Sequence, residues 1–271
     1  MITIHNLRKN FGTQTAVNIE NYTINQGEMV GLVGNNGAGK TTLFRLMLDL
    51  LKADTGEIII NDIHVSQSED WKSFTGAFID DGFLISYLTP EEYFYFIGKM
   101  YGLKKEEVDE RLIPFERFMN GEVLGQKKFI RNFSAGNKQK IGIVSAMLHY
   151  PKLIILDEPT AGLDPVGRSE ILGNIQSYRK AKNATIMMVS HSMEDVAQCA
   201  DRIAVLHQGR LVQADTPGKI FQAEDTLQAL GLELPAPCKL AAALRKRGMD
   251  VPHLYTAEAL TAFLLERRGH V

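Results

Sequence analysis

The stretch GNNGAGKT, residues 34–41, limits the possible folds of this chain more than any other feature. It fits the pattern G-x-x-x-x-G-K-[ST] in full, follows a strand-like run and precedes apolar residues at helical spacing. Glycines in such a loop let the backbone wrap so that its N–H groups, and the helix N-terminus, face phosphate groups. A chance match in a glycine-rich turn is the alternative, which the flanking strand and helix disfavour. The sequence therefore predicts a strand–loop–helix unit that binds nucleotide phosphates.

The side chains of this loop indicate separate roles. Lys40 can reach the β- and γ-phosphates, and Thr42 can add a phosphate contact. The Thr41 hydroxyl can coordinate Mg²⁺, which is the expected cofactor. The predicted ATP-binding residues of the loop are Gly34, Asn35, Asn36, Gly37, Ala38, Gly39, Lys40, Thr41 and Thr42.

Two acids follow an apolar run in LIILDE, where parallel α/β sheets place their chemistry. Asp157 is predicted to hold Mg²⁺, directly or through water, and Glu158 to polarise the attacking water. His191 closes another strand, IMMVSH, and is predicted to contact the γ-phosphate or that water. The alternatives are two solvated acids at a strand end and a structural histidine.

The order of segments predicts an α/β fold. Short strand-like runs fill the first quarter, and the pattern is helical from Thr89 to about Asn120, opening on a Thr cap, a Pro and two acids. Another helix is predicted from near Ala135. Apolar strands then alternate with helices, and RIAVLHQGRLVQAD is typical of a hairpin. This alternation predicts a mostly parallel sheet with helices on both faces, beside an antiparallel β subdomain.

The last part of the chain differs in composition. LGLELPAP is typical of a linker, and the amphipathic segments 238–247 and 256–268 follow it. We therefore predict one large domain over residues 1–223 and a small helical C-terminal extension over residues 224–271.

Charge and cysteine content limit the possible partners and environment. The net charge of -2 gives no reason to expect nucleic acid as a partner. The two cysteines, Cys199 and Cys238, lack metal-ligand spacing, which favours a reducing cytoplasm and structural thiols. No run approaches the length of a membrane span, and the first residues lack an apolar signal core. We therefore expect a soluble, cytoplasmic chain, which other chains would have to hold in place if it works at a membrane.

With these motifs the chain resembles the nucleotide-binding subunit of ATP-binding cassette (ABC) transporters over roughly residues 2–220. The phosphate loop, LIILDEPT, the AGLDP loop and His191 carry the resemblance. It implies a helical signature subdomain at about 82–150 and places Asp164 in a loop at a dimer interface. The aromatic run EEYFYFIG lies in the subdomain that, in the family, docks the coupling helix of a membrane subunit, but we expect most of its rings to be core. The resemblance also implies that Phe11, in KNFG, stacks on adenine, although an ordinary core phenylalanine is the alternative.

The family carries an LSGGQ-like signature before its catalytic strand, and FSAGNKQK occupies that place here. The corresponding residues Ser134, Ala135, Gly136 and Asn137 would contact the γ-phosphate of ATP on a second cassette. Ser134 and Gly136 keep the hydroxyl and the close backbone approach. A plain loop and helix cap is the alternative.

A further departure concerns the metal site. Where the family usually has a Gln near Mg²⁺, GAFIDD offers Asp80. The resemblance thus implies that Asp80, Thr41 and Asp157 surround Mg²⁺, with an added negative charge from Asp80.

The two ends of the chain are similar to different branches of the family. GAFIDD and FSAGNKQKIGI resemble antibiotic-resistance exporter cassettes, whereas VSHSMEDVAQCADRIAVLHQGR and the tail resemble energy-coupling-factor cassettes. The cargo and its direction stay open.

The resemblance implies an ATPase that closes head to tail with a second cassette, a homodimer partner or paralogue, and drives transmembrane permease subunits. A soluble cassette in translation or DNA repair, and a switch that barely hydrolyses ATP, are the alternatives. The single cassette and the absence of a long heptad insert disfavour the first, and Glu158 disfavours the second.

Overall fold

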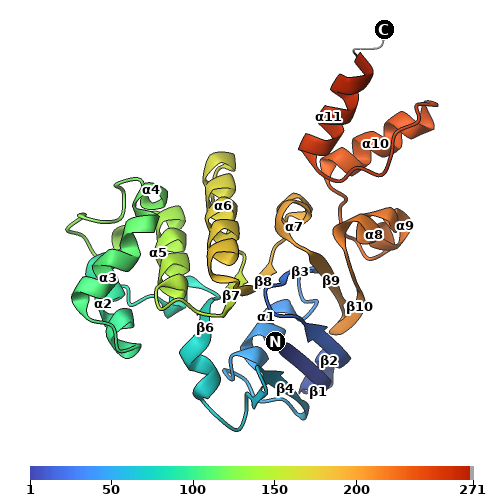
Figure 1. The fold of residues 1–271 in the computed structure, drawn as a ribbon. Helices are drawn as coiled ribbons and strands as arrows, with labels where there is room; N and C mark the ends of the chain where they lie inside the picture. Colours follow the sequence, from blue (N-terminus) through green and yellow to red (C-terminus); the bar gives the residue numbers. More distant parts are fainter. Residues whose placement is uncertain (269–271) are drawn as a thin grey trace.

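A six-stranded sheet forms the centre of the computed structural model, which describes residues 1–268 (Figure 1). Its strand order is β10-β9-β3-β8-β7-β6, and only the edge strand β10 pairs antiparallel. The prediction of a mostly parallel sheet is therefore confirmed. The strands are β3 (Met29–Val33), β6 (Thr75–Phe78), β7 (Leu153–Asp157), β8 (Thr185–Val189), β9 (Arg202–His207) and β10 (Arg210–Asp215).

The register of the parallel strands aligns their carboxyl ends. Asp157 and Leu32 both lie opposite Val189, and Phe78 lies opposite Leu156. The segments that follow β3, β8, β7 and β6 therefore leave the sheet side by side along one edge. Because α/β sheets carry their sites at this edge, the topology alone brings four distant parts of the sequence together.

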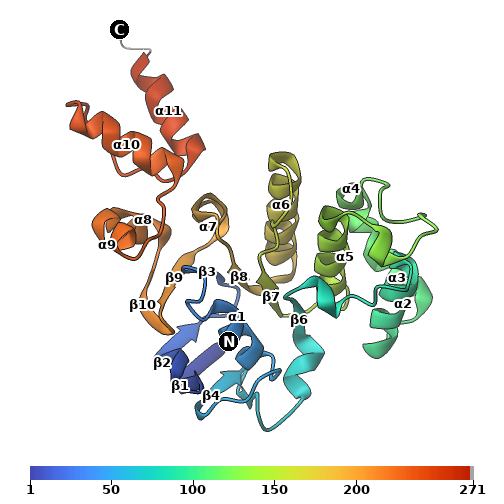
Figure 2. The ribbon, with the colours of Figure 1, turned by 180° about the vertical axis from the view of Figure 1, so that it is seen from behind.

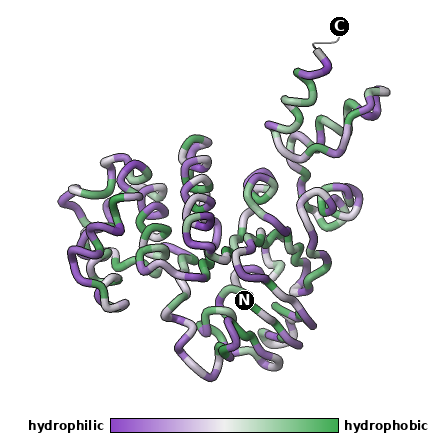
Figure 3. Tube along the Cα trace, viewed as in Figure 1, coloured by the Kyte–Doolittle hydropathy of each residue, from purple (hydrophilic) through white to green (hydrophobic). Residues whose placement is uncertain are grey.

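A second, antiparallel sheet of order β2-β1-β4-β5 covers one face of the first. Its inward residues, such as Ile4, share a core with Phe44 of α1 and with Leu32 of β3. Alternate residues of the parallel strands enter this core, so apolar residues line both faces of the central sheet. Hydrophobic residues, green in Figure 3, are accordingly frequent in the middle of the molecule. The elements are β1 (Ile2–Phe11), β2 (Gln14–Ile24), β4 (Thr55–Ile60), β5 (Ile63–His64) and α1 (Lys40–Met47).

Helices cover the opposite face and extend into a helical subdomain, green in Figure 1. The predicted cap at Thr89 is present as a capping box with Glu92, so α2 begins where its sequence signal placed it. The helices are α2 (Pro90–Met100), α3 (Lys105–Leu112), α4 (Glu116–Met119), α5 (Ala135–Met147), α6 (Pro165–Lys182) and α7 (Met193–Cys199), with short 3₁₀ turns η1 (Asp70–Phe74), η2 (Asp81–Phe83), η3 (Ile113–Phe115) and η4 (Ile130–Asn132).

Three of the four rings in the aromatic run of α2 contact the core. Tyr93 and Phe94 belong to the core, Tyr95 is half-buried and packs against it, and Phe96 is 45% exposed. Phe96 faces outward because consecutive residues of one helix cannot all face inward.

Four helices follow the hairpin of β9 and β10, and the last two project away from the sheets (Figure 2). Both predicted tail segments are helical, and a small core of Ala241, Val251 and Leu260 holds them together. α9 occupies part of the segment ahead of the predicted linker. These helices are α8 (Pro217–Gln222), α9 (Glu224–Ala229), α10 (Ala236–Lys246) and α11 (Ala257–Arg268).

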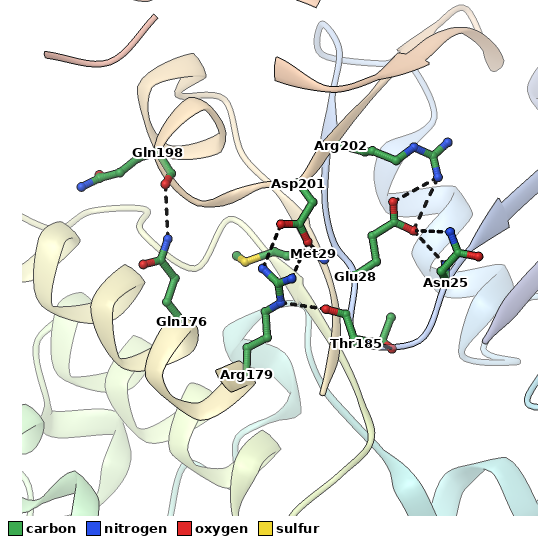
Figure 4. A network of polar contacts seen from close by, with 10 residues as sticks. Asn25, Glu28, Met29, Gln176, Arg179, Thr185, Gln198, Asp201 and Arg202 are labelled. Carbon is green, nitrogen blue, oxygen red and sulfur yellow. Dashed lines mark hydrogen bonds and ion pairs between the residues drawn. The ribbon is translucent and has the colours of Figure 1, made fainter. Parts of the chain in front are cut away.

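A polar network fixes the other end of the parallel strands (Figure 4). Arg179 of α6 forms an ion pair with Asp201, and the Arg179 Nε donates to the Gly27 carbonyl at 2.8 Å. Asp201 Oδ2 also accepts from the Met29 backbone N–H at 2.8 Å. Charge-assisted bonds at the start of β3 anchor the strand whose far end carries the phosphate loop.

Within residues 1–268, no helix is both long and apolar enough for a membrane crossing. Cys199 and Cys238 are buried free thiols, and burial raises the pKa of Cys199 to about 12.

Candidate active site

One cavity of about 560 Å³ lies at the carboxyl edge of the parallel strands. Twelve of the residues predicted for the site line it, together with three residues that the sequence analysis missed. Gln14, Ala16 and Ile79 carried no signal, since they are typical strand or loop residues. The predicted residues in the lining are Phe11, Asn36, Gly37, Ala38, Gly39, Lys40, Thr41, Thr42, Asp80, Asp157, Glu158 and His191.

The phosphate loop joins β3 to α1 with a tightly fitted backbone. Gly39, at the N-cap of α1, has φ +104°, and a Cβ there would lie 2.1 Å from the Ala16 carbonyl oxygen. Only glycine fits this position. The Lys40 ammonium donates to the carbonyl oxygens of Gly34 at 2.6 Å and Asn35 at 3.2 Å, so it is held inside the curve of the loop.

Asn35 lies differently from its neighbours in the loop. Its side-chain Nδ2 donates to the Leu230 carbonyl at 2.7 Å, so the amide points to the segment that follows α9 and not into the cavity. Gly34 and Asn35 contribute carbonyl oxygens that hold Lys40, and neither lines the cavity.

Burial changes the electrostatics of the loop lysine. It lowers the pKa of Lys40, while the nearby carboxylates of Glu158 and Asp157 oppose the change. A desolvated ammonium beside two carboxylates is suited to pair with phosphate, because opposite charges interact more strongly where water is excluded.

A hydroxyl and two carboxylates lie together beside the loop. Thr41 Oγ1 donates to Asp157 Oδ2 at 2.9 Å. Burial raises the pKa of Asp157, and the nearby charge of Asp80 adds a smaller increase. The Asp80 side chain also accepts from the Gly82 N–H at 2.7 Å as the cap of η2. Within residues 1–268 no cluster of three or more His, Cys, Asp or Glu could enclose a metal. This donor set fits Mg²⁺, which uses few protein oxygens and completes its shell with phosphates and water.

Glu158 and His191 form a pair at the strand ends. The ring Nε2 of His191 lies 3.2 Å from Glu158 Oε1, and the backbone N–H of His191 donates to Glu158 Oε2 at 3.1 Å. Glu158 has φ +49°, a backbone conformation that is uncommon for a residue other than glycine and is concentrated at functional sites. Burial raises the pKa of Glu158, which brings the carboxyl closer to the range of a general base.

Phe11 lies at the rim of the cavity, at the end of β1. Its ring is 53% exposed, with Lys9 Nζ 5.8 Å from the ring centroid. The alternative of a core phenylalanine is therefore wrong, and an exposed aromatic ring at the rim of the cavity suits stacking.

The signature residues lie outside this cavity. Ser134 is the N-cap of α5 and accepts from the Asn137 N–H at 3.3 Å, and the described lining residues do not include Ser134, Ala135, Gly136 or Asn137. Asp164 similarly caps α6, accepting from the Gly167 N–H at 2.7 Å. Within one chain both residues act as helix caps, so their roles toward a second cassette stay predictions.

A buried aspartate that the sequence analysis missed ties the catalytic loops together. Asp195 of α7 accepts from the Thr160 hydroxyl at 2.7 Å, from Ser190 at 3.4 Å and from Arg168 at 3.0 Å. These bonds join the segment after Glu158 to the residues on either side of His191. Its sequence signal, an acid three residues after Ser192, indicates only a helix start.

A phosphate loop in front of a parallel sheet, with acids and a histidine on the adjoining strand ends, defines a P-loop ATPase. The profile of the family described as "ABC transporter" matches residues 17–161, more than half of the chain. The chain belongs to this family, and its function is that of the ATP-hydrolysing subunit of a transporter.

Similar proteins span nearly the whole chain. It is 36% identical over 261 residues to the energy-coupling factor transporter ATP-binding protein EcfA2 of Clostridium tetani, covering 93% of this chain and 90% of that protein. The bacitracin transport ATP-binding protein BcrA of Bacillus licheniformis is 36% identical over 219 residues, covering 79% and 69%. Both branches that the sequence resembles are thus represented.

Solved structures agree in fold. An ATP-binding subunit of an ABC transporter superposes with a TM-score of 0.73 and 29% identity, covering 86% of this chain and 94% of that chain. The structure of cbiO1 from Clostridium perfringens, described as part of the complex cbiONQ, gives 0.71 and 26%, covering 86% and 95%.

Proposed function

We propose that the cavity binds Mg-ATP and that Glu158 polarises the water that attacks the γ-phosphate. The observation that carries the proposal is the convergence of Lys40, Asp157, Glu158 and His191 on one sheet edge. Lys40 and the loop N–H groups stabilise the phosphate charge, while His191 holds the Glu158 carboxylate through two contacts. Phosphoryl transfer depends mainly on such positioning and charge stabilisation.

Thr41, Asp157 and Asp80 are the residues that would hold Mg²⁺. The ion, when bound, neutralises charge on the β- and γ-phosphates. The Thr41–Asp157 hydrogen bond of 2.9 Å holds together two of the oxygen atoms that would bind the ion. Asp80 adds a negative charge where the family usually has a neutral Gln.

The complete site needs a second cassette. Ser134 is exposed at the N-cap of α5, and the described residues that line the cavity of its own chain do not include it. A second copy, or a paralogue, placed head to tail would bring this hydroxyl and Gly136 to the γ-phosphate. Each ATP would then be bound between two chains, and closure would follow from tighter binding of ATP to the closed dimer.

The dimer drives transmembrane permease subunits from the cytoplasmic face of the membrane. The energy-coupling factor type is favoured over the bacitracin-transport type. The match to EcfA2 spans 93% of the chain and so takes in most of residues 224–271, whereas the match to BcrA spans 79%.

Replacing the general base tests the catalytic assignment. Glu158→Gln should still bind ATP but lower hydrolysis by about 10²- to 10⁴-fold. It should also accumulate an ATP-bound dimer on size-exclusion chromatography. Glu20→Gln, an exposed glutamate on β2, is the matched control and should hydrolyse normally. Near-normal turnover of Glu158→Gln would contradict the assignment.

A mixed dimer tests the composite site. Lys40→Ala disables the phosphate loop of its own chain. Ser134→Arg disables only the signature that its chain contributes to the ATP site of the partner. Each variant alone should be nearly inactive. Mixing them creates one site with both defects and one with neither, so ATP-dependent dimer formation should return. If Ser134→Arg alone closes normally on ATP, or mixing gives no gain, residues 134–137 are a loop and cap only.

A further inference from the structure

A glutamine of the signature helix reaches the backbone of the proposed general base. Gln139 lies in the second turn of α5, and its side chain is buried, with a relative exposure of 8%. Its Nε2 donates to the carbonyl oxygen of Glu158 at 2.8 Å. A buried amide that makes a hydrogen bond of this length is a fixed structural contact, because losing its partner would leave a desolvated polar group.

The Glu158 backbone needs support at this point. With φ +49° the residue occupies a left-handed conformation that a side chain disfavours, so surrounding contacts must maintain it. Its N–H donates to the Val189 carbonyl at 3.1 Å, and its carbonyl also accepts from the Ala161 N–H at 3.0 Å. Gln139 supplies the one side-chain bond among these described contacts to the Glu158 backbone.

The packing of α5 fixes where Gln139 lies. A Cβ on Gly136 would lie 2.8 Å from Leu163 Cδ2, and a Cβ on Gly142 would lie 2.2 Å from the Phe78 ring. Gly136, Gln139 and Gly142 are spaced three residues apart, and all three meet the loop after β7 or the end of β6. The helix therefore sits in close contact with the sheet edge on both sides of Gln139.

We infer that Gln139 is a positioning residue that holds the Glu158 backbone, and so aims its carboxylate, in the same chain. This inference rests on the proposed function, in which Glu158 polarises the attacking water. Because the carboxylate and the carbonyl belong to one residue with an uncommon φ, a change at the carbonyl alters the direction of the side chain. The bond acts within a chain, whereas Ser134 and Gly136, one turn earlier on α5, act on the partner's ATP.

Removal of the amide tests the inference. Gln139→Met keeps the length and apolar volume of the side chain but cannot donate to Glu158. It should lower kcat about three- to tenfold, the usual effect of one hydrogen bond, and leave the KM for ATP unchanged. Gln176→Met is the matched control, since Gln176 Nε2 likewise donates to a backbone carbonyl, that of Gln198 at 3.3 Å, away from the cavity. An unchanged kcat in Gln139→Met overturns the inference.

A charged variant gives a readout that a purely structural role would not move. In Gln139→Glu a carboxylate would face the Glu158 carbonyl oxygen, whereas the protonated form can donate to it. The activity of this variant relative to wild type should therefore rise as the pH falls. The relative activity of Gln139→Met should stay flat over the same range, and a flat ratio for Gln139→Glu overturns the inference.

Two further measurements separate this inference from the proposed function. If Glu158→Gln keeps normal turnover, the proposed function fails. If Glu158→Gln is inactive and Gln139→Met is normal, only the role of Gln139 fails. In the mixed dimer of Lys40→Ala and Ser134→Arg, Gln139→Met should lower hydrolysis when placed in the Ser134→Arg chain, which supplies the active Glu158. A loss as large or larger when Gln139→Met is placed in the Lys40→Ala chain, which supplies the intact signature, would mean that Gln139 acts through the signature and would overturn the inference.

Discussion

Substitution of His149 should remove a pH-dependent part of the stability. Its ring stacks on Tyr101, with centroids 3.6 Å apart and planes 5° from parallel, and neither ring nitrogen has a hydrogen-bond partner. Burial lowers the pKa of His149 from 6.5 to about 4, and the charge of Arg111 adds to this effect. The Thr75 backbone lies nearby and opposes the shift, but it does not reach hydrogen-bond geometry with the ring.

The direction and size of the effect follow from this pKa. Between pH 6.5 and about pH 4 the unfolded chain binds a proton that the folded chain does not, so stability falls as the pH falls. Each pKa unit corresponds to about 1.4 kcal/mol, so the full loss is about 3 kcal/mol. Above the ordinary histidine pKa the group is neutral in both states and contributes no slope.

Urea unfolding of wild type and His149→Phe from about pH 7.5 to about pH 4.5 measures the effect. Phenylalanine can stack on Tyr101 but cannot titrate, and other groups cancel in the difference. The free energy of unfolding of wild type should fall by about 2 to 3 kcal/mol relative to the variant. His253→Gln, at an exposed histidine, should follow wild type. Parallel profiles for wild type and His149→Phe would refute the reasoning.

Three other predictions concern packing, buried charge and metal binding. Gly142→Ala should lower the free energy of unfolding, measured by urea denaturation, by about 1 to 3 kcal/mol, because the added Cβ would lie 2.2 Å from the Phe78 ring. Gly173→Ala in α6 is the control and should stabilise the protein, because the space around Gly173 is open. Burial raises the pKa of Asp157, so its charged form destabilises the folded protein at neutral pH. Asp157→Asn should therefore raise the Tm of the nucleotide-free protein at neutral pH, and the gain should shrink as the pH falls toward the ordinary carboxyl range. An unchanged Tm contradicts this. Asp80→Ala should shift the Mg²⁺ dependence of ATPase activity, and an unchanged dependence would assign the position to another residue.

The sequence by itself determined the residues with local signatures. The phosphate loop needs glycines and a lysine at fixed spacing, so its place was predictable, and the capping box at Thr89 fixed the start of α2. The alternation of apolar strands and helices was sufficient to predict a mostly parallel sheet, because only that arrangement buries both faces of such strands.

The tertiary structure decided the contacts between segments that are distant in the chain. Gln139, Asp195 and Gln14 are ordinary helix or strand residues in the sequence, and their roles depend on the elements that pack against them. Side-chain direction was equally undetermined. Phe11 is exposed at the end of β1 and Phe96 faces outward on α2, although an aromatic residue in a strand or helix is most often buried. Burial is a property of the assembled fold, and a sequence pattern specifies only which residues could share a face.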